Sequence, residues 1–217
     1  MILSPGRNYI FIHAPKTGGT AMALALERRA MKDDIMLGDT PKATRRRHRA
    51  QKLQAAGRLW KHSTLADING IVPDLSGFFT FTLVRNPWDR MVSYYHWLRA
   101  QGFDHPAVGL AQRLPFADFI TDTATRRANQ ASPARHYMTT VAGTEQCSAY
   151  IRLEALRADA APLWDHLGFT LELPHVNASD RDADYRGYYT DAARKAVAED
   201  CAEDIARFDY RFDDAVG

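Results

Sequence analysis

The sequence predicts an α/β domain with a mainly parallel central sheet, because stretches typical of buried strands alternate along the chain with helical stretches. Three strands are expected, at residues 8–13, 77–84 and 148–154, each rich in β-branched or aromatic residues. No repeat or low-complexity linker divides the 217 residues. We therefore expect a single domain over residues 1–217, large enough to bury a core.

Each expected strand is followed by a helix that the sequence marks. The first helix covers the mostly apolar residues 21–31. The second begins at Pro87, which suits a first helical turn, with Asn86 as its N-cap, and continues to residue 100. The third covers residues 155–168.

A last helix is predicted after Thr190, which can cap it. Apolar residues recur there on one face, at Val197, Cys201, Ile205 and Phe208. Cys201 is therefore expected to pack in the core and not to act as a reactive thiol.

Composition excludes several classes of protein. The chain is 46% hydrophobic and 25% charged, as in ordinary globular proteins, and no apolar run approaches the roughly 18 residues that span a bilayer. Two cysteines give neither a disulfide framework nor a zinc pattern, and the N-terminus lacks signal-peptide features. We expect a cytoplasmic protein without a membrane span. A net charge of +2 is too small to predict nucleic-acid binding.

Residues 42–61 contain many basic side chains and no acidic one. Such a segment is typical of a solvated helix face. It is also consistent with a patch that meets an anionic substrate or surface.

The loop "PKTGGT" follows the first strand and predicts an anion site. The start of a helix offers unpaired N–H groups and a positive dipole end, and Gly18 and Gly19 allow an anion to approach the backbone. Thr17 and Thr20 add hydroxyl groups, and Lys16 adds a charge. The alternative is an ordinary glycine-rich turn. Lys16 precedes the glycines, whereas the lysine of a common nucleotide-binding loop follows them.

The loop after the second strand predicts a second anion. Phosphate-loop NTPases often have an aspartate there that helps to hold Mg²⁺, whereas this chain has Arg85. Ser93, two turns along the next helix, can join Arg85 at one phosphate; the alternatives are a salt bridge and a surface serine. The histidines and cysteines show no metal-ligand spacing, so no metal site is expected.

The two motifs together resemble those of sulfotransferases that use 3′-phosphoadenosine 5′-phosphosulfate (PAPS). The chain is most similar to the Golgi carbohydrate sulfotransferases, of the heparan sulfate 2-O-, chondroitin and HNK-1 types, and to their bacterial relatives. The resemblance rests on "PKTGGT" and "VRNPWDRMVSYY" and continues through "KHSTLADI", "IRLEAL", "LPHVNAS" and "YRGYYTD". It implies a three-layer, P-loop NTPase-like sulfotransferase fold. The anchor and stem of the Golgi members have no counterpart, so a bare catalytic domain is expected.

The resemblance also implies roles for particular residues. The loop from Lys16 to Thr20 is expected to hold the 5′-phosphosulfate, and Arg85 and Ser93 the 3′-phosphate. A loop expected to close over the nucleotide, or alternatively to be a polar surface turn, contains Asn177, Ser179 and Arg181.

Sulfuryl transfer needs a base for the acceptor hydroxyl and positive charge at the leaving oxygen, for which Lys16 is the candidate. Spacing does not choose among the eight histidines, but the resemblance indicates His62. Ser63 or Thr64 can cap a short helix whose positive end keeps His62 neutral. A structural His62 is the alternative, and His13 and His96 are the next candidates for the base.

The acceptor is expected to be a hydroxyl of a saccharide or glycoconjugate. Polar contacts to it are assigned to Gln130 and Arg135, which lie between the recognised motifs. Two other functions stay open: a phosphate-loop kinase, disfavoured by the order of Lys16 and by Arg85, and a non-catalytic nucleotide-binding module, which would be expected to lack the base or the lysine.

Overall fold

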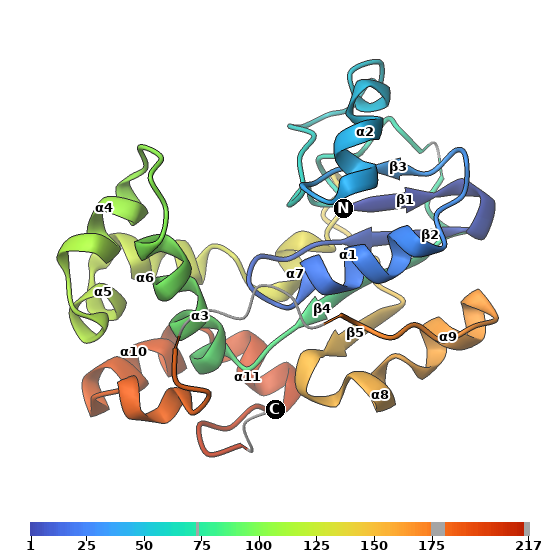
Figure 1. Cartoon of the computed structure of the whole chain (residues 1–217). Helices are drawn as coiled ribbons and strands as arrows, with labels where there is room; N and C mark the ends of the chain where they lie inside the picture. Colours follow the sequence, from blue (N-terminus) through green and yellow to red (C-terminus); the bar gives the residue numbers. More distant parts are fainter. Residues whose placement is uncertain (73, 175–180, 215–217) are drawn as a thin grey trace. The chain divides into compact units, whose positions relative to one another are not determined.

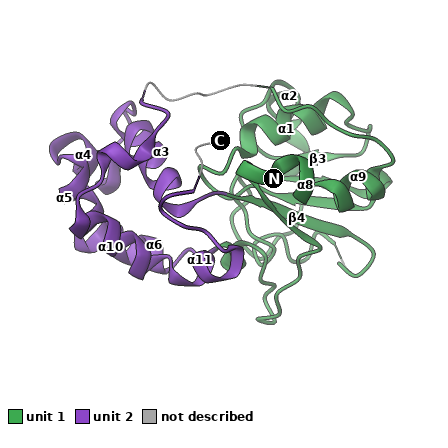
Figure 2. Ribbon diagram, turned by 90° about the horizontal axis from the view of Figure 1, so that it is seen from below, with its two compact units in different colours: residues 1–84, 134–177 green, residues 85–133, 178–217 purple. Residues whose placement is uncertain are grey.

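The computed structural model describes residues 1–72, 74–174 and 181–214. The chain forms two compact units (Figure 2): unit 1 comprises residues 1–84 and 134–177, and unit 2 comprises residues 85–133 and 178–217. The single catalytic domain expected over residues 1–217 stays a prediction.

Unit 1 contains a five-stranded sheet in the order β3-β1-β2-β4-β5 (Figure 1). The pairs β2–β4 and β4–β5 are parallel, whereas β1 is antiparallel to both β2 and β3. All strands of this sheet except β1 therefore point the same way, which confirms the predicted α/β class with a mainly parallel sheet. The strands are β1 Ile2–Ser4, β2 Tyr9–Ile12, β3 Ile35–Met36, β4 Phe79–Val84 and β5 Ala149–Arg152.

Alternating side chains of β2 supply both halves of the core. Tyr9 and Phe11 belong to a cluster with residues of α1, α2 and α9, while Ile10 and Ile12 pack with Tyr137 of α7 and with residues of segment 59–78. Helices therefore contribute to both faces of the sheet, as a layered α/β architecture requires. The helices of unit 1 are η1 Pro5–Arg7, α1 Gly19–Arg28, α2 Pro41–Ala50, α7 Ala134–Tyr137, η2 Leu153–Ala155, α8 Leu156–Asp159 and α9 Ala161–Leu167.

The helix predicted over residues 155–168 is divided in two. It consists of α8 and α9, and a proline lies in the first turn of α9. A proline inside a helix removes a backbone donor and clashes with the preceding turn, so the chain starts a new helix there.

Unit 2 is mainly helical. Its helices are α3 Pro87–Arg99, α4 Pro106–Arg113, α5 Phe116–Thr121, α6 Thr123–Gln130, η3 Tyr185–Tyr188, α10 Asp191–Asp200 and α11 Ala202–Phe208. The predicted N-cap of α3 is confirmed, because the Asn86 side chain accepts a hydrogen bond from the Trp88 N–H at 3.1 Å. Its amide group also donates to the carbonyl of Arg211 at 2.9 Å. Asn86 thus ties the start of α3 to the C-terminal segment.

The predicted last helix is capped by Thr190, as expected, but it breaks at Cys201 into α10 and α11. Burial raises the pKa of the Cys201 thiol to about 12. The thiol is therefore protonated at neutral pH, which agrees with the unreactive role expected for Cys201.

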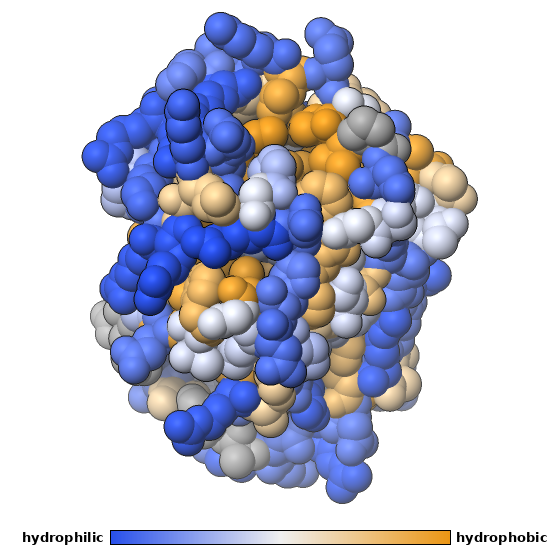
Figure 3. Space-filling view, turned by 90° about the vertical axis from the view of Figure 1, so that its right-hand side faces the viewer, coloured by the Kyte–Doolittle hydropathy of each residue, from blue (hydrophilic) through white to orange (hydrophobic). Residues whose placement is uncertain are grey.

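The surface view in Figure 3 is mostly hydrophilic, with apolar groups between the polar ones. Within the described residues, none of the helices has the length and apolar character needed to traverse a membrane.

Candidate active site

The loop between β2 and α1 has a backbone conformation that explains its glycine. Gly18, the N-cap of α1, has a φ of 83°, and Lys16 has a φ of 65°, both in the left-handed region. The buried Thr17 hydroxyl donates to the carbonyl of Ala14 at 2.9 Å. Thr17 therefore fixes the loop from inside, directly before the N-cap of α1.

Gly19 is the position at which the loop contacts His13. A Cβ atom built on Gly19 would lie 2.7 Å from Cγ of the His13 ring, which leaves no room for a side chain. A Cβ on Gly18 would lie 2.7 Å from a methyl group of Leu153. The absence of side chains at both glycines lets the loop pack against the ends of β2 and β5.

Replacing Gly19 by alanine is expected to destabilise the protein by about 1–3 kcal/mol, because the new methyl group must displace the buried His13 ring. Denaturant unfolding measures the effect. Gly77→Ala is the matched control, since a Cβ there meets nothing within 4 Å, and it is expected to change stability by less than ~0.5 kcal/mol. Equal stabilities of the two variants would contradict this packing.

His62 is held by the backbone of His13. Its Nδ1 lies 2.7 Å from the carbonyl oxygen of His13, and the two rings meet edge to face with their centroids 4.7 Å apart. A carbonyl can only accept, so Nδ1 carries the proton of neutral His62 and Nε2 carries the lone pair. The structure therefore fixes which nitrogen can act as a base.

Burial keeps His62 neutral. It lowers the pKa of His62 to about 4, although the hydrogen bond to His13 opposes this effect. Burial also lowers the pKa of His13 well below its usual value, and the nearby charges of Lys61 and Lys16 add to the effect. Both imidazoles are uncharged at neutral pH.

The helix predicted after His62 is only a single turn, although Thr64 caps that turn as expected. Ser63 instead donates to the carbonyl of Arg58 at 2.9 Å, and Thr64 and Asp67 exchange side-chain and backbone hydrogen bonds across a turn. A single turn has no substantial dipole. The neutral state of His62 follows from burial and not from a helix end.

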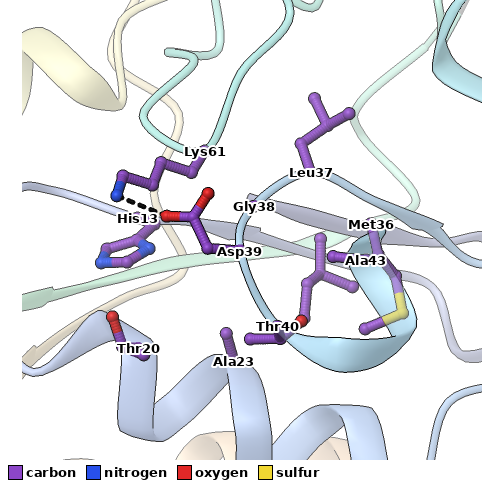
Figure 4. A pocket seen from close by; sticks show the side chains of 11 residues that line it. His13, Thr20, Ala23, Met36, Leu37, Gly38, Asp39, Thr40, Ala43 and Lys61 are labelled. Carbon is purple, nitrogen blue, oxygen red and sulfur yellow. Dashed lines mark hydrogen bonds and ion pairs between the residues drawn. The ribbon is translucent and has the colours of Figure 1, made fainter. Parts of the chain in front are cut away.

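A pocket in unit 1 adjoins these groups (Figure 4). Its lining includes Thr20 of α1, the His13 ring, and the ion pair between Lys61 and Asp39, whose Nζ and Oδ2 atoms are 2.6 Å apart. Apolar groups from β1, α1, β3 and α2 complete the lining. The indole of Trp60, which is 41% exposed, meets the His62 ring edge to face at 5.0 Å. Sequence reasoning did not identify Asp39, because its proximity to His13 depends on the tertiary fold. Trp60 was also missed, although it lies only two residues before His62.

In unit 2, Arg85 directly follows the last residue of β4 and bonds to Asp89 of α3. The Arg85 Nε and Nη2 atoms lie 2.8 and 2.6 Å from Asp89 Oδ2. Nη2 of Arg181 lies 2.6 Å from the other carboxylate oxygen. Asp89 thus joins two of the predicted site residues, and the spacing of four between Arg85 and Asp89 was the sequence signal for it.

Ser93 lies one turn after Asp89 on the same side of α3. It is 6% exposed, and no hydrogen bond of its hydroxyl is found within the described part of the chain. The alternative of a surface serine is therefore wrong. Two other predicted residues of this site, Asn177 and Ser179, lie outside the described residues.

The two candidate acceptor contacts lie in different units. Gln130, at the end of α6, donates at 2.7 Å to Asp200 Oδ1, a carboxylate that Arg126 also binds, so its amide helps to hold α6 to α10. Arg135 belongs to α7 in unit 1 and is exposed.

The basic segment 42–61 begins as helix α2. Lys42 is tied to the buried Glu27, and Arg46 to the carbonyl of Met31. Arg45, Arg47, Lys52 and Arg58 are exposed. Part of the segment anchors α2, and the rest faces solvent.

No group of three or more His, Cys, Asp or Glu residues with metal-binding geometry is found among residues 1–72, 74–174 and 181–214. The donor groups gathered at both loops are lysine, arginine, hydroxyl and backbone N–H groups, which suit anions.

Comparison with family models identifies a match for this chain. The model of a family described as "Sulfotransferase family" matches residues 1–207. Among solved structures, the mouse sulfotransferase SULT7A1 in complex with PAP is similar at 14% identity, with a TM-score of 0.44, over 95% of this chain and 87% of that chain. A search of curated proteins finds no significant match.

Proposed function

The chain belongs to the sulfotransferase family, and we propose that it transfers a sulfuryl group from PAPS to a hydroxyl of a saccharide or glycoconjugate. The observation that carries the proposal is the hydrogen bond between His62 Nδ1 and the carbonyl of His13. It leaves Nε2 of a neutral imidazole to act as the base. The cytoplasmic location expected from the sequence is part of the same proposal.

We assign the proton transfer to His62. The acceptor hydroxyl gives its proton to Nε2, its oxygen bonds to sulfur, and the bond between sulfur and the departing phosphate oxygen breaks. Lys16 is assigned to the negative charge that develops on that oxygen. The Lys16 charge acts on His13, whose ring meets His62, so both assigned groups lie in the same region of unit 1.

The donor is assigned to the two anion-binding loops. The 5′-phosphosulfate is assigned to the loop residues Thr17 and Gly18 and to the first turn of α1. That turn begins with Gly19 and Thr20 and offers unpaired backbone N–H groups. In unit 2, the donors assigned to the 3′-phosphate are the side chains of Arg85, Ser93 and Arg181. Asn177 and Ser179 stay predictions from the resemblance.

The pocket beside His13 is assigned to the reacting end of the acceptor alone. Its volume of about 20 Å³ has room for little more than one water-sized group, and a hydroxyl suits a lining in which a charged pair and a threonine face apolar groups. Gln130 and Arg135 stay predicted acceptor contacts. The exposed bases of segment 42–61 are a candidate surface for an anionic acceptor.

The kinase alternative is tested by ligand-induced stabilisation. At about 100 times its Kd, PAPS is expected to raise Tm by roughly 5–10 °C, because it binds only the folded protein. Adenosine 5′-phosphosulfate, which lacks the 3′-phosphate, should stabilise less at the same concentration. Greater stabilisation by ATP with Mg²⁺ than by PAPS would overturn the proposal, and turnover of labelled sulfate separates an enzyme from a non-catalytic module.

The pH dependence of kcat/KM tests the state of His62. The base must be unprotonated, so activity is expected to stay level through pH 6.5 and to be lost only as pH falls through about 4. Initial rates measured at pH values where circular dichroism shows a folded protein give the profile. An inflection near the usual histidine pKa of about 6.5 would contradict a buried neutral base.

A further inference from the structure

Asp89 links two guanidinium groups in unit 2. One of its oxygens accepts from Arg85 at 2.6 and 2.8 Å, and the other accepts from Arg181 at 2.6 Å. The three side chains are only 16%, 12% and 9% exposed, in the order Arg85, Asp89 and Arg181. This is a largely buried network that joins the start of unit 2 to a residue 92 positions from Asp89 along the chain.

The network fixes the direction of Arg85. The edge formed by Nε and Nη2 faces Asp89, so the plane of the guanidinium is set by two contacts and not by one. Ser93 follows Asp89 by one turn on the same side of α3, with its hydroxyl on the same helix face as the carboxylate. Asp89 therefore orients both of the arginines to which the 3′-phosphate has been assigned.

We propose that Asp89 is a positioning residue for 3′-phosphate recognition, holding Arg85 and Arg181 in the geometry that distinguishes a 3′-phosphorylated nucleotide from one without that group. The inference rests on the proposed function. Asp89 itself is an anion and does not contact the phosphate. Its effect is exerted through the two arginines, each of which offers donors in a fixed planar array.

Charge and positioning make opposite predictions for Asp89→Asn. If only net charge mattered, removing a carboxylate beside a phosphate site would strengthen anion binding. If Asp89 positions the arginines, the variant loses the charge-assisted bonds that hold them, and the two guanidinium groups repel each other. Binding of the 3′-phosphate then weakens.

The experiment compares 3′-phosphoadenosine 5′-phosphate (PAP) with adenosine 5′-phosphate (AMP), which differ only in the 3′-phosphate. Calorimetric titration gives the ratio of the two affinities for the native chain, for Asp89→Asn and for Asp200→Asn. The control residue Asp200 is also a buried carboxylate of unit 2 that joins two side chains, Arg126 and Gln130. We expect the native chain to prefer PAP by ~30-fold or more, from two or more charge-assisted contacts. The preference should fall at least ~10-fold in Asp89→Asn and change less than ~2-fold in Asp200→Asn.

The possible outcomes distinguish the proposed 3′-phosphate site from the positioning role of Asp89. A native chain that binds PAP and AMP equally overturns the proposed 3′-phosphate site itself. A native preference that Asp89→Asn retains or increases overturns the positioning role and leaves the site standing. A loss in Asp89→Asn but not in Asp200→Asn supports both.

A second variant covers the case in which Asp89→Asn does not fold. Asp89→Glu keeps the negative charge and the ion pairs but shifts the carboxylate by one methylene. We expect it to fold and to reduce the preference for PAP by at least ~3-fold, with smaller changes in the affinity for AMP. An unchanged preference in folded Asp89→Glu would overturn the positioning role.

Discussion

Replacing His62 by asparagine is expected to lower kcat by about 10²–10⁴-fold, the usual contribution of a general base. The asparagine amide can still donate to the carbonyl of His13, but it has no counterpart of Nε2. The loop should therefore keep its structure while the proton acceptor is lost. Rates measured with labelled sulfate under saturating PAPS give the effect, and the affinity for PAP should stay within ~3-fold of the native value.

The control for this variant is His166→Gln. His166 Nε2 also lies 2.9 Å from a backbone carbonyl, that of Arg7, but next to the opposite end of β2. A glutamine there can preserve the hydrogen bond, and activity should be unchanged. A His62→Asn variant with near-native turnover would remove His62 as the base and return the role to His13 or His96.

Lys16→Met is expected to reduce kcat by about 10²–10³-fold, the typical effect of removing one donor from a developing negative charge. Methionine keeps the length of the side chain and meets the same backbone constraint at the φ of 65°. The loss is expected in kcat more than in the KM for PAPS, because charge on the leaving oxygen grows in the transition state.

A lysine outside the site provides the comparison. Lys195 of α10 is 78% exposed, and within the described residues its side chain makes a single long ion pair, of 3.9 Å, with Glu199. Lys195→Met should leave kcat within ~2-fold of the native value. If Lys16→Met changed only the KM for PAPS, Lys16 would be a ground-state anchor and not a stabiliser of the leaving group.

The central strands β2 and β4 could be predicted because they are buried along almost their whole length and are rich in β-branched and aromatic residues. β2, β4 and β5 all lie within the predicted ranges. β1 and β3 were missed because they are three and two residues long, and their extended conformation depends on pairing with each other. Short strands carry too few residues for a periodic pattern.

The breaks within helices could not be predicted from the spacing of apolar residues either. The apolar spacing of four around Cys201 continues through the break between α10 and α11, so periodicity alone predicted one helix. Caps were predicted well, at Asn86 and Thr190, because a cap depends on neighbours within three residues.

The candidate site shows the same division between local and distant information. The glycine loop, Arg85 and Ser93 are marked by local sequence or by resemblance. The tautomer of His62 depends on a carbonyl 49 residues away, and the contact of Asp89 with Arg181 spans 92 residues. Such contacts arise from the tertiary fold and cannot be predicted from a single sequence.

The contact between His13 and Gly19 has a consequence for protein engineering. The His13 ring fills the volume that a side chain at position 19 would need, so the residues at positions 13 and 19 cannot both be large. A mutant library that pairs a small residue at 13 with alanine at 19 is therefore expected to contain more stable members than one that varies position 19 alone.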